Sequence, residues 1–219
     1  MKKSAKKRKE KIFVFSAHSD DFVIGAGGTI AQYVQEGKKV YTIIFTKGEK
    51  SHPWMKGGYV AKMRQKETWA AAKILNCKPT FLDLQEGRIT ENYHSQNKEE
   101  QLLKLLERIK PQKIFTHSAE DPHPDHKSVK QITLELVEKL SFKPEVYIYS
   151  VWNPVSLRTS YPALYVKITN TFSLKLKALK SFHSQYVHVS YPFFLLLFRA
   201  LKDGWKLRTL FGEMFYRIK

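Results

Sequence analysis

Two short stretches of the sequence contain histidine and aspartate at spacings that suit metal-assisted hydrolysis. Each stretch places a His three positions before an Asp or a second His, so both side chains of the pair point the same way on a first helical turn. One imidazole from each stretch and one carboxylate would form a three-ligand site with an open position, as in catalytic zinc sites. The remaining His and Asp side chains would then be available for proton transfer. The residues are His18, Asp20 and Asp21 in AHSDD (17–21), and Asp121, His123, Asp125 and His126 in SAEDPHPDH (118–126).

The elements around these stretches alternate between strand and helix. Apolar, β-branched or aromatic runs predict short buried strands, and patterns of helical period lie between them. Such alternation produces βαβ units and a parallel sheet. We therefore expect an α/β fold, a Rossmann-like three-layer sandwich with a mostly parallel twisted sheet and a C-terminal extension of helix and strand. The predicted strands are 11–17, 39–46, 79–84, 113–118 and 145–152, and the predicted helices are 26–36, 60–76, 97–110 and 126–140.

This topology should bring the two stretches together. In a doubly wound sheet of order 3-2-1-4-5, ligands bind beyond the carboxyl ends of the strands where the order reverses, between strands 1 and 4. AHSDD follows strand 1 and SAEDPHPDH follows strand 4. We expect residues 12–170 to form the catalytic domain, residues 171–219 to pack on it as an extension, and residues 1–11 to form a polybasic tail.

The charge of the chain is strongly positive and lies mainly at its two ends. The net charge is +18, of which residues 1–11 contribute +6 and residues 171–219 contribute +7. We expect neither a signal peptide nor a membrane span, since the apolar run 12–15 is short and no run approaches about 20 apolar residues. The single cysteine, Cys77, excludes an internal disulfide and fits a reducing compartment. We expect a cytoplasmic protein, either free or peripheral at a membrane.

The two stretches and their surroundings resemble a known family. AHSDD followed by GAGGTIA, then RQKETWAAAKILN and DPHPDH, is similar to the zinc-dependent N-acetylglucosamine deacetylases of the LmbE/PIG-L family, whose usual motifs are AHPDD and HPDH. KLKALKSFHSQ (175–185) and FGEMF (211–215) also resemble C-terminal segments of that family, so the likeness covers nearly the whole chain. The departures are Ser19 in place of proline and Phe22 in place of glutamate, and neither replaces a presumed ligand.

The resemblance implies one Zn²⁺ per chain and removal of the acetyl group from an N-acetylglucosamine moiety, carried by a small molecule or a lipid. Zinc would activate water and polarise the acetamide, a carboxylate would move the proton, and a protonated His123 would add an oxyanion donor. The implied ligands are His18, Asp21 and His126, the implied base is Asp20, and the implied oxyanion donor or acid is His123, oriented by Asp125.

Several nearby residues have two interpretations. The resemblance implies that Arg64 contacts substrate, whereas its spacing from Glu67 also fits a surface ion pair. GAGGTIA lacks the GxGxxG spacing of a dinucleotide site, which favours glycines that permit close helix packing. His117 and His183 are candidates for the pocket wall, with packing or capping as the alternative.

The C-terminal segment has apolar residues at helical spacing, with basic residues on other faces of the same helix. Such a helix could close the core, form a contact in a homo-oligomer, or lie on an anionic membrane beside the polybasic tail. The apolar residues are Phe194, Phe198, Leu201 and Trp205, and the basic ones are Arg199, Lys202, Lys206 and Arg208.

Two other function classes remain as alternatives. A metal-dependent hydrolase of another bond, such as a phosphoester, shares the same ligands, although a two-metal mechanism would need more carboxylates. A basic nucleic-acid-binding protein without catalysis would place its charge along one stripe with aromatic residues. Because the charge here is terminal, we expect no nucleic-acid partner.

Overall fold

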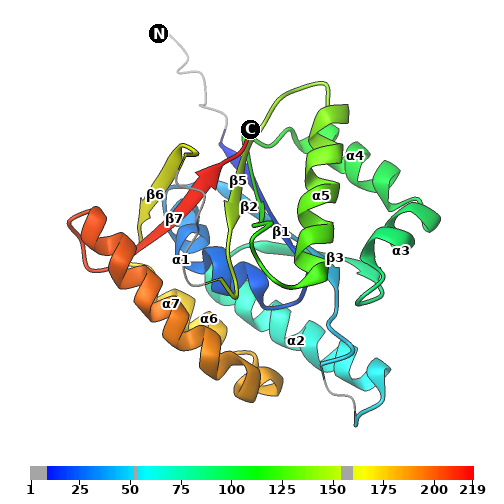
Figure 1. The fold of residues 1–219 in the computed structure, drawn as a ribbon, viewed down its shortest axis with the longest axis horizontal. Coiled ribbons are helices and arrows are strands. Elements are labelled where there is room, and N and C mark those ends of the chain that lie inside the picture. Colours follow the sequence, from blue (N-terminus) through cyan, green and yellow to red (C-terminus); the bar gives the residue numbers. More distant parts are fainter. Residues whose placement is uncertain (1–8, 52–53, 154–159) are drawn as a thin grey trace, which may run out of the picture.

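A single seven-stranded sheet organises the chain (Figure 1). The computed structural model describes residues 9–51, 54–153 and 160–219, with the backbone alone for residues 186–192, so residues 1–8 of the polybasic tail lie outside the described residues. The strand order is β3-β2-β1-β4-β5-β7-β6, which confirms the predicted order 3-2-1-4-5 and the α/β class. Strands β1 to β5 are parallel, and β7 is antiparallel to β5 and β6. The strands are β1 (Lys11–Ser16), β2 (Lys39–Thr46), β3 (Lys78–Leu84), β4 (Lys113–His117), β5 (Glu145–Tyr149), β6 (Ala163–Lys167) and β7 (Gly212–Arg217).

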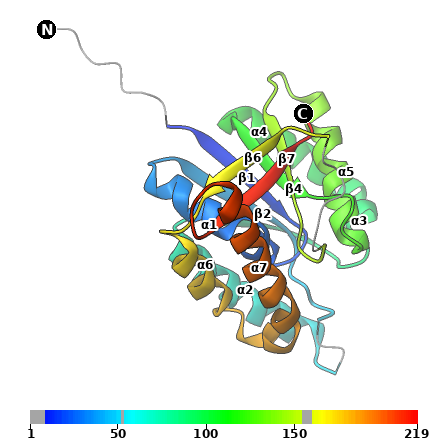
Figure 2. The same cartoon turned by 60° about the vertical axis from the view of Figure 1, so that its left-hand side comes forward.

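Two layers of helices cover the two faces of this sheet, as Figures 1 and 2 show from two sides. The first layer consists of α1 (Asp21–Gln35), α2 (Gly57–Leu75), α6 (Phe172–Leu179) and α7 (Tyr186–Lys206), with a short 3-10 helix, η1 (His183–Gln185), before α7. The second consists of α3 (Ile89–Ser95), α4 (Lys98–Ile109) and α5 (Pro124–Lys139). Alternate residues of β1 face the two cores, Ile12 and Val14 toward the first layer and Phe13 and Phe15 toward the second. Burial on both faces explains why the strands are nearly continuous apolar runs.

The glycine-rich segment after AHSDD lies inside a helix. The prediction that this helix starts at residue 26 was wrong, because α1 begins at Asp21 and includes the glycines. A Cβ on Gly25 would lie 2.1 Å from the Tyr149 ring, and one on Gly28 would lie 2.6 Å from the Ile168 side chain. The close-packing interpretation of these glycines is therefore confirmed.

A buried ion pair inside the C-terminal segment 171–219 also binds the segment to helix α1, because Lys175 donates to the Ile24 carbonyl at 2.8 Å. Lys175 Nζ of α6 lies 2.6 Å from Glu213 Oε1 of β7, and both side chains are buried. Glu213 also accepts the backbone N–H groups of Gly28 and Thr29 in α1, at 3.1 and 2.7 Å. Because β7 is inserted between β5 and β6, this segment completes the sheet and anchors the helix that follows AHSDD.

Replacing Glu213 by Ala is expected to lower the free energy of unfolding by about 3–5 kcal/mol, because it leaves the Lys175 ammonium buried without its partner. Urea denaturation followed by circular dichroism measures this change. Glu100→Ala, which removes an exposed partner of Lys104 on α4, should leave the unfolding midpoint nearly unchanged. Equal effects of the two substitutions would show that the buried ion pair contributes no more to stability than the exposed one.

Candidate metal centre

Both His/Asp stretches lie at the carboxyl ends of adjacent strands. Strand β1 ends at Ser16, whose hydroxyl accepts the Phe22 N–H at 2.9 Å and donates to the His18 carbonyl at 2.8 Å. Asp21 Oδ2 accepts the backbone N–H of His18 at 2.7 Å, which closes a tight turn into α1. Across the sheet, β4 leads into α5, where His123 is the N-cap and Pro124 the first helical residue. The predicted meeting of the two stretches between β1 and β4 is confirmed.

Three donor atoms from these stretches form a nearly equilateral triangle. His18 Nδ1 lies 3.3 Å from Asp21 Oδ2 and 3.3 Å from His126 Nε2. His126 Nε2 lies 3.4 Å from Asp21 Oδ2. Tetrahedral ligands at zinc distances of about 2.0–2.1 Å are separated by about 3.3–3.4 Å. The three buried side chains therefore fit three corners of a tetrahedral metal site.

The charges around this triangle favour a cation. Burial alone would lower the pKa of His18, but the surrounding carboxylates, first that of Asp21, raise it to about 10. His126 behaves in the same way, and its pKa rises to about 9. Burial would raise the pKa of Asp21, yet the neighbouring imidazoles hold it well below the usual value. The carboxylate charge that stabilises protons on these two imidazoles would also stabilise a divalent cation bound between them.

Each imidazole of the triangle is oriented by a carboxylate on its far side. His18 Nε2 lies 3.2 Å from Asp125 Oδ2, and His126 Nδ1 lies 2.9 Å from Asp121 Oδ1. Carboxylates in this position fix the ring and its tautomer in metal sites. The prediction that Asp125 orients His123 differs from this arrangement. The Asp125 carboxylate turns toward His18, and its link to His123 is through its backbone N–H, which is donated to the cap residue.

Asp121 belonged to the second stretch but had no predicted role. Its Oδ2 accepts the backbone N–H groups of Val151 and Trp152, at 3.0 and 3.1 Å. These bonds draw the chain away from the sheet, which explains why β5 ends at Tyr149 and not at residue 152 as predicted. Arg199 of α7 donates to the Val151 carbonyl at 2.8 Å from the other side. The residues after β5 are thus held against the site from both directions.

The substitution Asp121→Asn is expected to weaken metal binding about 10–100-fold, because it removes the charged partner of the His126 ring while preserving its shape. Titration against a chelator of known affinity gives the dissociation constant. Glu120→Gln, the same chemical change at the neighbouring residue, should leave that constant unchanged. If the two variants bind metal equally well, Asp121 does not support His126.

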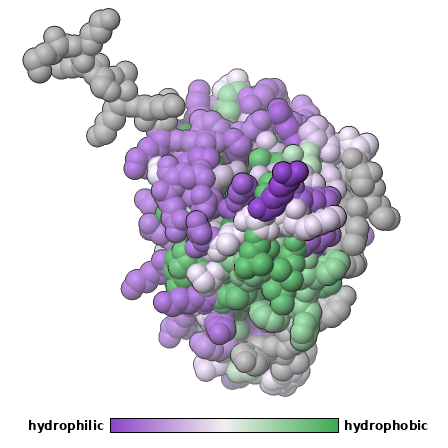
Figure 3. Space-filling view, turned by 90° about the vertical axis from the view of Figure 1, so that its left-hand side faces the viewer, coloured by the Kyte–Doolittle hydropathy of each residue, from purple (hydrophilic) through white to green (hydrophobic). Residues whose placement is uncertain are grey.

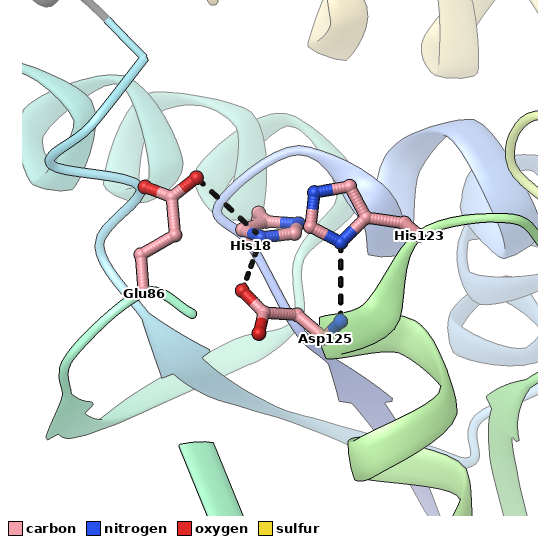
Figure 4. Close-up of side chains that lie close together, drawn as sticks. All are labelled: His18, Glu86, His123 and Asp125. Carbon is pink, nitrogen blue, oxygen red and sulfur yellow. Dashed lines mark hydrogen bonds and ion pairs between the residues drawn. The ribbon is translucent and has the colours of Figure 1, made fainter. Parts of the chain in front are cut away.

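A second group of donors surrounds the outer side of His18 (Figure 4). Figure 4 shows the carboxylates of Glu86 and Asp125 both directed at this ring, with Nε2 to oxygen distances of 3.9 and 3.2 Å. Both carboxylates of this group also accept backbone N–H groups, since Asp125 accepts the Gly87 N–H at 3.0 Å and Glu86 accepts the Lys50 N–H at 2.9 Å. These contacts favour a supporting role around His18. Glu86 follows β3 and belongs to no motif, so nothing in the sequence marks it as a site residue.

A pocket of about 420 Å³ lies in front of the triangle, and His18, Asp20, Asp21, His123 and Arg64 all line it. Arg64 of α2 is only 4% exposed, and its Nη2 donates to Asp20 Oδ1 at 3.0 Å. The alternative of a surface ion pair between Arg64 and Glu67 is therefore wrong.

Glu67 instead connects helix α2 to the segment before α7. Its two oxygens accept the backbone N–H and the hydroxyl of Ser184 in η1, at 2.7 and 2.6 Å. The next residue, Gln185, lines the pocket. Arg64 and Glu67, although three positions apart, thus bind two different parts of the site.

The other histidines differ in their surroundings. His117 is fully buried, accepts the Ala17 N–H on Nε2 at 2.9 Å and stacks on the His126 ring, which favours the packing interpretation. Burial, and then His126, lower its pKa to about 4, which favours the neutral ring. His183 is exposed on η1. His123 accepts the Asp125 N–H on Nδ1, which assigns its own proton to Nε2. Burial and then the neighbouring imidazoles lower the pKa of His123, so the neutral ring is favoured over the protonated one that we had expected.

The fold is an α/β sandwich, and three His/Asp side chains that could hold a metal ion meet at the topological switch point of its sheet. The chain belongs to the PIG-L family, described as GlcNAc-PI de-N-acetylase, whose family model matches residues 13–137. Enzymes of this family are metal-dependent, in agreement with the donor set found here.

Similar proteins include deacetylases and hydratases. A 4-oxalmesaconate hydratase from Pseudomonas putida is 27% identical over 194 residues, covering 78% of this chain and 72% of the relative. The structure of N,N'-diacetylchitobiose deacetylase from Pyrococcus horikoshii superposes with a TM-score of 0.78 at 26% identity, covering 97% of this chain and 85% of that one. A 4-carboxy-2-hydroxymuconate hydratase from Pseudomonas putida shares the fold, with a TM-score of 0.81, 22% identity and coverage of 96% of both chains.

Proposed function

We propose that this protein is a zinc-dependent N-deacetylase that hydrolyses the acetamide of an N-acetylglucosamine moiety to acetate and a free amine. The observation that carries the proposal is the donor triangle of His18, Asp21 and His126, which lies beside a pocket also lined by Asp20 and His123. A metal site, a carboxylate and an imidazole at one pocket supply what amide hydrolysis requires. The family match and the deacetylase among the similar structures support the same reaction.

In this proposal His18, Asp21 and His126 would hold one Zn²⁺ beside the pocket. Bound there, the ion supplies Lewis acidity toward the acetamide carbonyl and lowers the pKa of a water molecule. Asp20 takes the proton of the attacking water and delivers it to the leaving nitrogen. Its carboxylate is held for this role by Arg64 through a 3.0 Å bond. Asp20 and Asp21 have different roles, base and metal ligand, because neighbouring residues at the start of a helix point in different directions.

His123 is the proposed donor to the carbonyl oxygen as negative charge develops on it. With its Nδ1 occupied by the Asp125 N–H, the ring presents Nε2–H, and a neutral imidazole can make this hydrogen bond. Asp125 acts through His18 by orienting that ligand. Donation of a hydrogen bond to the carbonyl oxygen therefore requires no protonation of His123.

For the substrate we propose an N-acetylglucosamine conjugate. The pocket volume of about 420 Å³ is in the range of small-molecule sites. Trp54 and Trp152 line it, and flat aromatic side chains suit the apolar faces of a sugar ring. Arg64 lines the same pocket, so we retain it as a substrate contact in addition to its bond with Asp20.

Hydration of an unsaturated carboxylic acid is the second candidate, because the relative at 27% identity is a hydratase. The two reactions are separated by incubating the zinc-loaded protein with two sets of compounds. One set is N-acetylglucosamine, its β-1,4 dimer and N-acetylglucosaminyl-phosphatidylinositol, assayed for acetate. The other is 4-oxalmesaconate, assayed by its ultraviolet absorbance. Acetate release supports the proposal, whereas turnover of 4-oxalmesaconate without any acetate release would replace it with the hydratase.

A further inference from the structure

Helix α7 carries a row of large apolar side chains on its outer side. Phe194, Phe198, Leu201 and Trp205 follow one another at helical spacing, and Leu210 lies just beyond the helix. We call these five residues the α7 apolar surface, and they are between 43% and 82% exposed. Figure 3, which views the side of the molecule formed by α7 and β6, shows apolar residues gathered there and bordered by hydrophilic ones. Exposed apolar areas of this kind mark interaction sites.

The opposite side of the same helix is already used by the core. Leu196 and Ala200 are buried in the first helical layer, and Asp203 and Gly204 are buried near β7. Gly204 sits against the chain after the helix, where a Cβ would lie 2.4 Å from the Leu210 carbonyl oxygen. Because packing fixes the inner side, rotation of α7 cannot bury the exposed row. Closing the core, one of the roles considered for this segment, accounts for the inner side of the helix but not for the exposed apolar side.

Within segment 171–219, the charge exposed next to this row is of one sign. From residue 171 to residue 219 the only acidic residues are Asp203 and Glu213, and the structure buries both. The basic residues Lys206 and Arg208 are exposed beside the row, and Lys206 Nζ lies 3.2 Å from the Tyr165 hydroxyl of β6. A second copy docking through the same surface would bring cations against cations. An anionic surface matches both the charge and the apolar row.

We propose that the α7 apolar surface docks on an anionic lipid bilayer, with its aromatic and Leu side chains at the level of the acyl boundary and Lys206 and Arg208 among the headgroups. Among the described residues, the structure contains no helix with the length and apolar character needed to cross a bilayer. The basic residues of segment 1–11 add electrostatic attraction. Helix α7 begins next to Gln185, which lines the pocket.

Co-sedimentation with vesicles tests this contact independently of catalysis. The full-length protein is mixed at low salt with vesicles of phosphatidylcholine and phosphatidylserine, or of phosphatidylcholine alone. We expect binding to the anionic vesicles only. Lys206→Glu with Arg208→Glu should weaken the partition coefficient at least about twentyfold, since each basic residue near the surface contributes about fivefold. Phe198→Ser with Trp205→Ser should weaken binding at least about tenfold.

Two controls make changes of the same kind elsewhere, a matched double charge reversal and a single loss of an exposed aromatic side chain. Arg108→Glu with Lys127→Glu alters the net charge equally on α4 and α5, which cover the opposite face of the sheet. Tyr59→Ser removes an exposed aromatic residue at the start of α2, far from the end of α7 in Figure 1. Both controls should bind like the unaltered protein. No binding to anionic vesicles, or equal losses in control and α7 variants, would overturn the proposal. A dimer in sedimentation velocity that Trp205→Ser dissociates, without vesicle binding, would assign the surface to a second copy instead.

Discussion

Asp20→Asn is expected to lower kcat for acetate release by a factor of about 10²–10⁴, the contribution of a positioned general base. The amide keeps the size of the carboxylate and an oxygen that can still accept the Arg64 hydrogen bond, but it cannot take a proton from water. Because Asp20 is not one of the three triangle donors, bound zinc and KM should change little. Steady-state acetate release and metal analysis of the same sample measure both effects.

Asp83→Asn is the control for this substitution. It makes the same chemical change at an exposed residue that pairs with Lys47, and it should leave kcat unchanged. A variant at Asp20 that loses its zinc together with its activity would instead identify Asp20 as a ligand. Undiminished activity in the Asp20 variant would remove it from the mechanism.

His126→Ala is expected to weaken metal binding by more than about 100-fold, because even loss of an outer carboxylate costs about 10–100-fold. The side chain is fully buried, and its Nε2 forms one corner of the donor triangle. Acetate release should fall with the bound metal. Metal content after dialysis against a weak chelator, measured by atomic emission, gives the result directly.

His94→Ala removes an exposed histidine on α3 and should retain the full metal content. Circular dichroism of both variants shows whether the fold is kept, since removal of the buried His126 ring also leaves a cavity. A folded His126 variant that retains one equivalent of zinc would contradict the assignment of this residue as a ligand.

The sequence was sufficient to predict how the main site residues meet. The strands are buried on both faces, so their apolar runs are continuous, and the reversal of strand order brings the ends of β1 and β4 together. His18 lies in the turn after β1, and Asp21 and His126 lie in the first turns of the helices that follow β1 and β4, so their positions depend mainly on that topology. The boundary of α1 was misplaced because glycines that pack against Tyr149 look like a loop when no neighbour is known.

The contacts that orient these residues depend on loop conformations that no spacing rule describes. Asp121 reaches His126 because it also accepts two N–H groups beyond β5, and Glu86 faces His18 because its loop is bonded to Lys50. Arg64 lies three positions from Glu67, yet the packing of α2 directs it to Asp20. In each of these cases the orientation of the side chain depends on a contact with a residue from a different part of the chain.

An anomalous difference map recorded at the zinc edge tests most directly whether His18, Asp21 and His126 together hold the ion on which catalysis depends. Crystals would be grown with one equivalent of Zn²⁺ per chain. We predict a single peak bonded to His18 Nδ1, Asp21 Oδ2 and His126 Nε2, the three atoms that lie 3.3–3.4 Å apart. A peak among Glu86, His123 and Asp125, or no peak near His18, would contradict this account of the site.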